Sequence, residues 1–279
     1  MENEKLARLI AIEDEGIENL KYIEKELEGT FDIQTLKMNQ DVDEENLRSL
    51  FDGIEILFTL YNSDDKDVLN IARAIEAMSS PRRILTISID TSEKQEVGNI
   101  NETKSSSSPS LNSGSNAGSN FNSKSNAAED ESKKEAEGEE VQFGREIAIQ
   151  TSKLPKFAKI MKMMADSLSM ECLINIDITD LREVIAGEKG IKYSYNEFSM
   201  ETFDIDLASR EIEESIESQG SEFLGKSNVI LLEGEIELSQ LNDFITKITQ
   251  SEGDPAWSIF SFNEAHDTQN RLKVTFIQN

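Results

Sequence analysis

Two turns carry side chains that could do chemistry, because each places three carboxylates directly after a predicted buried strand. The first turn holds Glu13, Asp14, Glu15 and Gly16, and the second holds Asn62, Ser63, Asp64, Asp65 and Asp67. Carboxylates suit the positive N-terminal ends of the helices predicted to follow. Their oxygen atoms are also ligands that Mg²⁺ or Ca²⁺ accepts. The helix-start role is favoured, since acidic helix starts are common, and no metal site is predicted.

A third group consists of Asn175, Asp177 and Asp180 and has the spacing N-x-D-x-x-D. It leads into an apolar pattern that predicts a helix over residues 180–186. Asp177 or Thr179 could cap this helix, with Asp180 in its favourable first turn. Capping is therefore one interpretation of this group.

The counts of reactive residues exclude several kinds of site. Cys172 is the only cysteine and His266 the only histidine, which excludes an intrachain disulfide and a Cys/His zinc site. A Ser-His-Asp triad would need His266, which lies in a polar stretch that predicts a hairpin loop. The 55 acidic and 28 basic residues give a net charge of −27, which disfavours nucleic acid and membrane surfaces as partners. Without a signal-peptide pattern or an apolar span, a soluble cytoplasmic protein is expected.

The elements that must position these residues alternate along the first part of the chain. Strands are predicted over residues 7–12, 31–36, 54–60 and 83–89, and helices over 17–27, 44–51 and 68–78. Such strand–helix–strand units predict a parallel sheet covered by helices. A Ser-, Asn- and Glu-rich stretch over residues 92–141 then predicts a disordered insert, because its composition cannot bury enough apolar area.

A second α/β unit is predicted after the insert. Directly after the insert, a strand is predicted over residues 146–150 and a helix over 154–168. The methionines of this helix indicate core packing. The later helices are predicted over residues 180–186, 207–217 and 238–249, and the strands over 192–195 and 228–233, with a final hairpin over 257–262 and 271–277. The predicted parts are 1–91, 92–141, 142–172 and 173–279.

Five segments of the C-terminal half share the order and spacing of one known family. They are residues 174–182 (INIDITDLR), 228–235 (NVILLEGE), 238–242 (LSQLN), 254–260 (DPAWSIF) and 271–277 (RLKVTFI). The first resembles the NxDxxD loop of FtsZ, the bacterial division protein of the tubulin fold, and the others resemble its later strands and helix. The resemblance implies a Rossmann-type parallel-sheet domain, a central helix and a second α/β domain with a four-stranded sheet.

The N-terminal half aligns with the same family but lacks its phosphate-binding chemistry. FtsZ binds GTP with two glycine-rich loops, GGGGxN and GGGTGSG, and the two acidic turns stand at the matching positions. Phosphate binding needs bare backbone N–H groups at a helix N-terminus. Carboxylates there would repel a triphosphate by about 4 kcal/mol per pair at about 4 Å and an effective dielectric of about 20. A reduced nucleotide-binding-type domain without GTP, other cofactor or GTPase activity is therefore expected.

The third group keeps its match to the family. In FtsZ filaments the NxDxxD loop enters the nucleotide pocket of the neighbouring subunit, where its aspartates orient the attacking water. The resemblance implies that Asn175, Asp177 and Asp180 form an interface loop for another subunit. The family's Phe-Ala is replaced here by Ile178 and Thr179, which changes the fine geometry of the loop.

Three hypotheses follow from this combination. The leading one is a non-catalytic protein that binds an FtsZ-type GTPase, or another cytoskeletal protein, and modulates filaments in cell division or the cytoskeleton. The second is a nucleotide-independent homo-oligomer, which head-to-tail repulsion between acidic turns disfavours unless cations bridge them. The third, a GTPase with a remodelled pocket, ranks last because no phosphate-binding turn is evident.

Overall fold

The computed structural model describes residues 6–37, 48–92, 144–169, 172–186, 191–219, 227–249, 257–264 and 270–279. Nearly all of the predicted insert lies outside this part of the chain, as does the start of the helix predicted over residues 44–51. None of the helices in the described ranges is both long enough and apolar enough to span a membrane.

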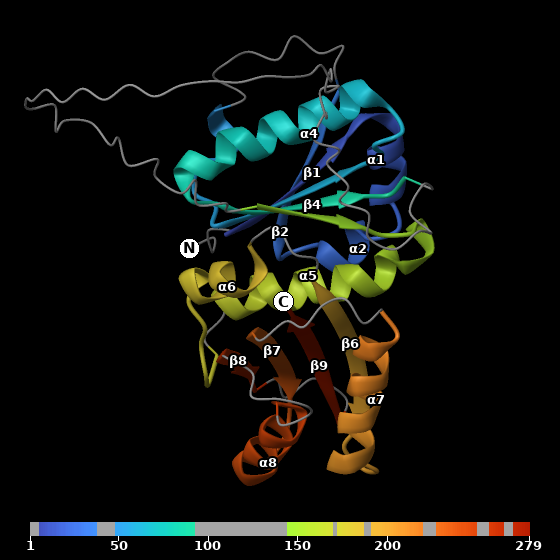
Figure 1. Cartoon of the computed structure of the whole chain (residues 1–279). Helices are drawn as coiled ribbons and strands as arrows, with labels where there is room; N and C mark the ends of the chain where they lie inside the picture. The colour runs from blue at the N-terminus through green and yellow to red at the C-terminus, as the bar shows by residue number, and fades with distance from the viewer. Residues whose placement is uncertain are drawn as a thin grey trace, which may run out of the picture. The chain divides into compact units, whose positions relative to one another are not determined.

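The first sheet contains five parallel strands in the order β2-β1-β3-β4-β5 (Figure 1). The strands are β1 (Ala7–Ile12), β2 (Phe31–Leu36), β3 (Ile56–Tyr61), β4 (Leu85–Asp90) and β5 (Gly144–Ala148). Every residue of β3 and β4 is buried. Both faces of a parallel sheet are covered, so its central strands need apolar residues at nearly every position. The predicted parallel sheet is confirmed.

Helices cover both faces of this sheet. One face packs against α1 (Glu13–Leu20), α2 (Glu24–Leu27) and α5 (Leu154–Ser169), and the other against α4 (Lys66–Ser79). Short 3₁₀ turns, Ser80–Arg82 and Thr151–Lys153, follow α4 and precede α5. In α4 the residues Val68, Ala72 and Ile75 recur at helical spacing and are all buried, as the amphipathic pattern requires.

The helix predicted over residues 17–27 is interrupted, so that prediction is corrected. Backbone N–H groups of Lys21, Tyr22 and Ile23 donate to carbonyls three residues earlier, at 3.3, 3.1 and 2.9 Å. This tighter bonding ends α1, and α2 begins after it. The apolar spacing persists across the break, because Leu20, Ile23 and Leu27 are all buried.

The second sheet contains four strands in the order β6-β9-β7-β8. They are β6 (Lys192–Ser199), β7 (Ser227–Gly234), β8 (Trp257–Asn263) and β9 (Arg271–Gln278). β7 and β8 are parallel, whereas β9 runs antiparallel to both β6 and β7. The prediction that the last two strands form a hairpin is wrong, because β8 and β9 are not neighbours. β9 lies between β6 and β7 and pairs with both of them. The chain therefore crosses from β8, on one side of β7, to the other side of β7 before β9 begins. His266 lies outside the described residues.

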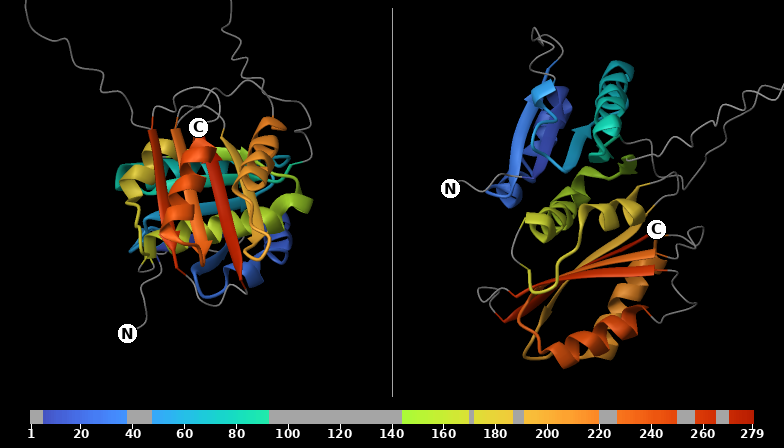
Figure 2. Two further views of the ribbon diagram at one scale, coloured as in Figure 1. Left: turned by 90° about the horizontal axis from the view of Figure 1, so that it is seen from below. Right: turned by 90° about the vertical axis from the view of Figure 1, so that its left-hand side faces the viewer.

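Three helices accompany the second sheet: α6 (Ile178–Ile185), α7 (Ile205–Glu217) and α8 (Leu238–Thr249). Side chains of α7 and α8 form one apolar cluster with β7 and β9. Figure 2 shows these two helices on one face of the sheet and α5 and α6 on the other. The sheet is therefore the middle layer between two pairs of helices.

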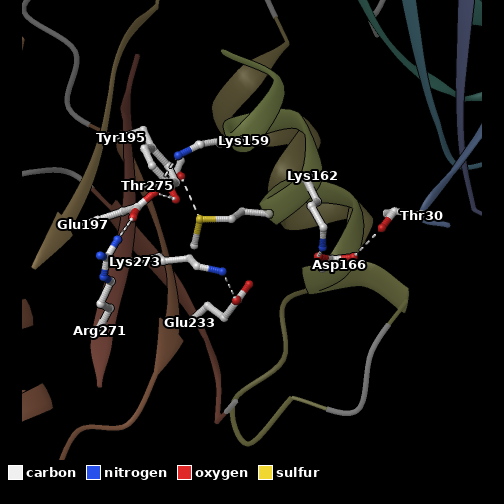
Figure 3. Close-up of polar contacts among 11 residues, drawn as sticks. Thr30, Lys159, Lys162, Asp166, Tyr195, Glu197, Glu233, Arg271, Lys273 and Thr275 are labelled. Atoms are coloured by element: carbon white, nitrogen blue, oxygen red, sulfur yellow. Dashed lines mark hydrogen bonds and ion pairs between the residues drawn. The ribbon is translucent and has the colours of Figure 1, made fainter. Parts of the chain in front are cut away.

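α5 joins the two sheets, because its buried side chains belong to an apolar cluster that includes residues of both. The ring of Phe157 lies 5.1 Å from that of Tyr193 on β6, edge to face. Thr275 on β9 donates a hydrogen bond to Met163 Sδ at 3.1 Å. On the other side, Thr30 donates to Asp166 at 3.2 Å (Figure 3). α5 is thus the central helix that the resemblance implied.

A charged network reinforces the contact between α5 and the second sheet (Figure 3). Lys159 Nζ and the Tyr195 hydroxyl donate to Glu197 Oε1 at 2.6 and 2.7 Å, and Arg271 donates to Glu197 Oε2 at 3.1 Å. The hydrogen bond from Lys159, with the bonds from Tyr195 and Arg271, lowers the pKa of Glu197 to about 2. Three elements, α5, β6 and β9, therefore meet at one carboxylate.

Candidate functional site

The two acidic turns lie at the same edge of the first sheet. They follow β1 and β3, which are parallel neighbours, so their carboxyl ends point the same way. α1 approaches β3 closely at Gly16, where an added Cβ would lie 2.4 Å from the carbonyl oxygen of Leu60. Gly16 is therefore required for helix–strand packing, and any side chain there would push α1 away. This edge is where parallel α/β sheets bind ligands.

The first turn has no loop between strand and helix. Glu13 is the first residue of α1, directly after Ile12, and has a φ of 59°. Glu13, Asp14 and Glu15 all fall in the first turn of α1, where the helix dipole favours negative charge. Asp14 also pairs with Lys37 at 2.7 Å, and this hydrogen bond lowers the pKa of Asp14. All three acids therefore lie at a helix start, the position expected for them.

The second turn is also organised around a helix start. Asn62 Oδ1 accepts the N–H of Asp64 at 2.8 Å, and Asp65 Oδ1 accepts the N–H of Asp67 at 2.9 Å. Asp65 is the N-cap of α4, and Asp67 lies in its first turn. Both acids therefore stand at the start of α4, the position expected for them, and Asp65 also caps the helix. Among the described residues, no three Asp, Glu, His or Cys side chains are arranged to hold a metal ion.

Beside the second turn, at the end of β4, lies a buried carboxylate that the sequence interpretation missed. Asp90 is the last residue of β4 and is 1% exposed. Ser63 donates its backbone N–H to Asp90 Oδ1 at 3.0 Å and its hydroxyl to Oδ2 at 2.6 Å. Ser92 repeats this pattern, with both distances 3.0 Å. An aspartate that ends an apolar strand at the ligand-binding edge is the signal that could have identified this residue.

Further hydrogen bonds join the strand ends around Asp90. Thr91 donates its backbone N–H and its hydroxyl to the carbonyl of Tyr61, each at 2.9 Å. Asn19 of α1 donates its side-chain amide to the Thr91 hydroxyl at 2.9 Å. The backbone amides of Ser63 and Ser92, from the ends of two neighbouring strands, thus converge on one carboxylate oxygen of Asp90.

The predicted interface loop forms a short, well-bonded connection between α5 and α6. Asn175 Oδ1 accepts the N–H of Cys172 at 3.1 Å, which closes the turn. Ile174 pairs with Phe262 of β8 as an antiparallel bridge. Asp177 is the N-cap of α6 and accepts the N–H of Thr179 at 2.6 Å. This hydrogen bond lowers the pKa of Asp177, which is exposed and stays ionised at neutral pH.

α6 begins at Ile178, two residues before its predicted start, so Asp180 lies inside its first turn. The other end of α6 is held by Arg145 of β5, whose Nε donates to the carbonyl of Ile185 at 2.6 Å. Arg145 is 3% exposed, and burial lowers its pKa to about 10, so it is charged at neutral pH. A cation at a helix C-terminus interacts favourably with the dipole. α6 is therefore fixed at both ends.

The structure does not bring the acidic turns and the interface loop together. α5 begins near the carboxyl edge of the first sheet and runs away from it, and the loop follows its far end (Figure 1). Its 16 residues span roughly 24 Å at 1.5 Å per residue. A single copy therefore presents two separate features: a carboxyl edge where the amides of Ser63 and Ser92 bond to Asp90, and a loop on which Asn175 and Asp177 are exposed and Asp180 is half-buried.

This architecture is similar to that of solved FtsZ structures. A structure of the M. jannaschii FtsZ dimer, described as empty, aligns with 98% of this chain and 87% of its own, with a TM-score of 0.57 and 12% identity. A point mutant of M. jannaschii FtsZ aligns with 98% of this chain and 90% of its own, with a TM-score of 0.51 and 11% identity. No protein-family model and no curated protein matches the sequence. The two sheets and the helix between them define the FtsZ/tubulin-like fold, and this chain has that fold.

Proposed function

We propose that this chain is a non-catalytic FtsZ-like protein that binds FtsZ-type filaments and modulates them in cell division or the cytoskeleton. It acts through protein contact, without binding or hydrolysing GTP. The observation that carries this proposal is Asp90, whose carboxylate occupies the backbone amides at the carboxyl edge of the sheet. The fold is established independently of this proposal, and a fold alone does not determine function.

The electrostatics of this edge supports the loss of nucleotide binding. A phosphate group could use the amides of Ser63 and Ser92 only after displacing the carboxylate of Asp90, which four hydrogen bonds hold in place. Displacement would leave a buried charge without its partners, which costs several kcal/mol. Exposed carboxylates at Asp14, Glu15 and Asp64 add further repulsion. The cost of displacing Asp90 and the repulsion from the exposed acids both oppose phosphate binding.

The interface loop supports the contact role. It retains Asn175, Asp177 and Asp180 in an ordered arrangement, and Asn175 and Asp177 are exposed. By the resemblance to FtsZ, this loop would face the nucleotide pocket of a filament subunit. One chain would then offer its loop to a filament but no pocket of its own. Such asymmetry favours a modulator over a repeating subunit.

Co-sedimentation with GTP-assembled M. jannaschii FtsZ tests the contact. The test variant is Asp177→Asn with Asp180→Asn, which removes both charges while asparagine still caps α6. We expect at least a roughly tenfold loss of binding, as for hot-spot residues. The matched control is Asp204→Asn, because Asp204 caps α7 in the same way, accepting the N–H of Leu207 at 3.0 Å. Absence of wild-type binding, or equal binding by the double variant, would contradict the proposal.

Titration calorimetry with GTP and Mg²⁺ tests the loss of nucleotide binding separately. We expect no binding in the micromolar range. Micromolar affinity would favour the remodelled-pocket hypothesis instead. Light scattering of the chain alone, with and without Mg²⁺, tests self-association, and scattering that rises with Mg²⁺ would favour the homo-oligomer.

A further inference from the structure

We propose that the free edge of β8 takes up an extended, uncharged segment of the filament partner as an additional strand. The inference rests on the proposed function and names a second contact surface, next to the interface loop. It depends on backbone groups of β8, whereas the family-derived expectation concerns the side chains of Asn175, Asp177 and Asp180. Three observations carry it: the composition of β8, its unused backbone groups and its position beside the loop.

β8 differs from the other edge strands of the protein because it carries no charge. The strand order places β2 and β5 at the edges of the first sheet, and β6 and β8 at the edges of the second. Asp32 lies in β2, Glu146 in β5 and Glu197 in β6, whereas β8 (WSIFSFN) contains neither a charged residue nor a proline. Charged residues and proline protect an edge against pairing with another chain. β8 is therefore the edge strand that lacks this protection.

The outward backbone groups of β8 are unused over most of the strand. The N–H and C=O of one residue point to the same side of a strand, and those of the next residue point to the other side. Phe262 bonds outward to Ile174, so Ser258 and Phe260 also point outward, whereas Ile259 points toward β7. Within the described residues, no backbone hydrogen bond reaches the N–H or C=O of Ser258 or Phe260. These donors and acceptors are open to a further strand.

The side chains of β8 indicate what kind of segment would fit. α7 and α8 lie on one face of the second sheet, and α5 and α6 lie on the other (Figure 2). Ile259 belongs to the apolar cluster that contains α5, and Phe260 packs against the cluster formed with α7 and α8. An added strand would meet apolar side chains on both of its faces. The fitting segment is therefore extended, apolar and without charge.

The interface loop lies at the end of this free edge. Ile174 forms an isolated antiparallel bridge with Phe262, and the chain then turns into α6. The open groups of Phe260 come directly before the bridged residue. A partner that contacts the exposed Asn175 and Asp177 is therefore placed next to the free edge, so that the loop and the strand form one continuous contact surface.

A second copy of this chain is a less favourable occupant of the edge. Two copies that each carry a net charge of −27 repel one another. Pairing of two such short edges would also bury less than the roughly 1,200 Å² that stable protein interfaces need. Addition of one extended segment requires only main-chain hydrogen bonds and contacts of alternate side chains. A segment of the filament partner is therefore the occupant to test.

Hydrogen–deuterium exchange resolved to single residues tests strand addition directly, with GTP-assembled M. jannaschii FtsZ as the probe. In the complex, the N–H groups of Ser258 and Phe260 should exchange at least about tenfold more slowly than in the free chain, because each gains a hydrogen bond. The N–H of Ile259 points toward β7 and should change much less. Equal slowing at all three residues, or slowing at none, would overturn the inference.

Proline substitution is the second test, because proline removes an N–H and is tolerated where the N–H of an edge strand faces solvent. Ser258→Pro should weaken co-sedimentation with the same filaments at least about tenfold. Ser199→Pro is the matched control and should bind like wild type. Ser199 points outward from β6, the opposite edge of the sheet, since the next residue, Met200, bonds inward to Asn270. Equal binding by the two variants would contradict the inference, and if Ser258→Pro does not fold, the exchange measurement decides.

The outcomes separate this inference from the proposed function. If the filaments bind the wild-type chain and Asp177→Asn with Asp180→Asn weakens that binding, but Ser258 and Phe260 gain no protection, the added strand fails while the proposed function stands. Protection that rises with the concentration of this chain alone would assign the edge to a second copy and overturn the inference. If the wild-type chain does not bind, both fail.

Discussion

At the scale of single residues, the carboxyl edge of the first sheet holds one strained and one buried acid. Glu13 has a φ of 59°, a left-handed conformation that glycine adopts without penalty, whereas Asp90 is buried and bonded by two serines. The two residues respond to substitution for opposite reasons. Removing the Glu13 side chain relieves backbone strain, whereas removing the Asp90 carboxylate breaks its hydrogen bonds with Ser63 and Ser92.

Glu13→Gly should raise the free energy of unfolding by about 0.5–1 kcal/mol, because it relieves the left-handed strain. Glu15→Gly is the control: Glu15 is not among the residues of positive φ, and glycine inside a helix costs about 1 kcal/mol. Urea denaturation of both variants measures the difference. The prediction fails if both substitutions destabilise the protein equally.

Asp90→Ala should lower the free energy of unfolding by about 2–4 kcal/mol, since it removes a buried carboxylate that accepts four hydrogen bonds from Ser63 and Ser92. Asp32→Ala provides the comparison. Asp32 pairs with Arg8 at 2.8 Å, but its side chain is 38% exposed, so its loss should cost less than about 1 kcal/mol. Similar costs measured by chemical denaturation would contradict the role assigned to Asp90.

At the scale of elements, two contacts set the positions in space of helices for which the apolar pattern predicted only the residue ranges. Arg145 of β5 bonds to the C-terminus of α6, and Lys159 of α5 bonds to Glu197 of β6. Both contacts join elements far apart in the sequence. They hold α5 and α6, the two helices that the interface loop connects.

Arg145→Met should loosen α6 without unfolding the protein. The substitution removes the donor to the Ile185 carbonyl while an apolar stem of similar length fills the space. Hydrogen–deuterium exchange of residues 178–186 should become faster, with little change in α7 as the internal reference. Arg145→Lys keeps the charge near the helix end and should be intermediate. Unchanged exchange in α6 would show that this contact does not hold the helix.

Glu197→Gln should reveal a pH-dependent contribution to stability. The pKa of Glu197 is lowered from 4.5 to about 2 in the folded protein, so its contribution is complete above pH 4.5 and is lost as pH falls through about 2. With allowance for solvent screening, the variant should be about 1 kcal/mol less stable at pH 7. The difference should shrink between pH 4.5 and 2. Glu18→Gln, in an exposed pair with Lys21, is the control and should show almost no change.

At the scale of the whole molecule, the net charge of −27 sets the response to salt. Repulsion among acids destabilises a compact state, and added salt screens it. The free energy of unfolding in urea should therefore rise by on the order of 1 kcal/mol between about 0.05 and about 0.5 M KCl. A decrease would mean that surface ion pairs outweigh the repulsion.

The parallel sheet, the central helix and the four-stranded second sheet could all be predicted from apolar periodicity and from the ordered segments shared with FtsZ. The position of β9 could not, because strand order depends on pairing between distant residues such as Tyr193 and Ile277. Asp90 was missed because its role arises only when Ser63 and Ser92 meet it in space. The capping by Asp177 could be foreseen as one interpretation, because a cap is a local interaction.

The placement of β9 also has a consequence for the order of events during synthesis. β6, β7 and β8 leave the ribosome before the strand that links β6 to β7 has been made. β7 and β8 can pair early through α8, but β6 has no strand partner until residues 271–278 emerge. The second sheet must therefore close after translation of its other strands is complete, with its central position filled last.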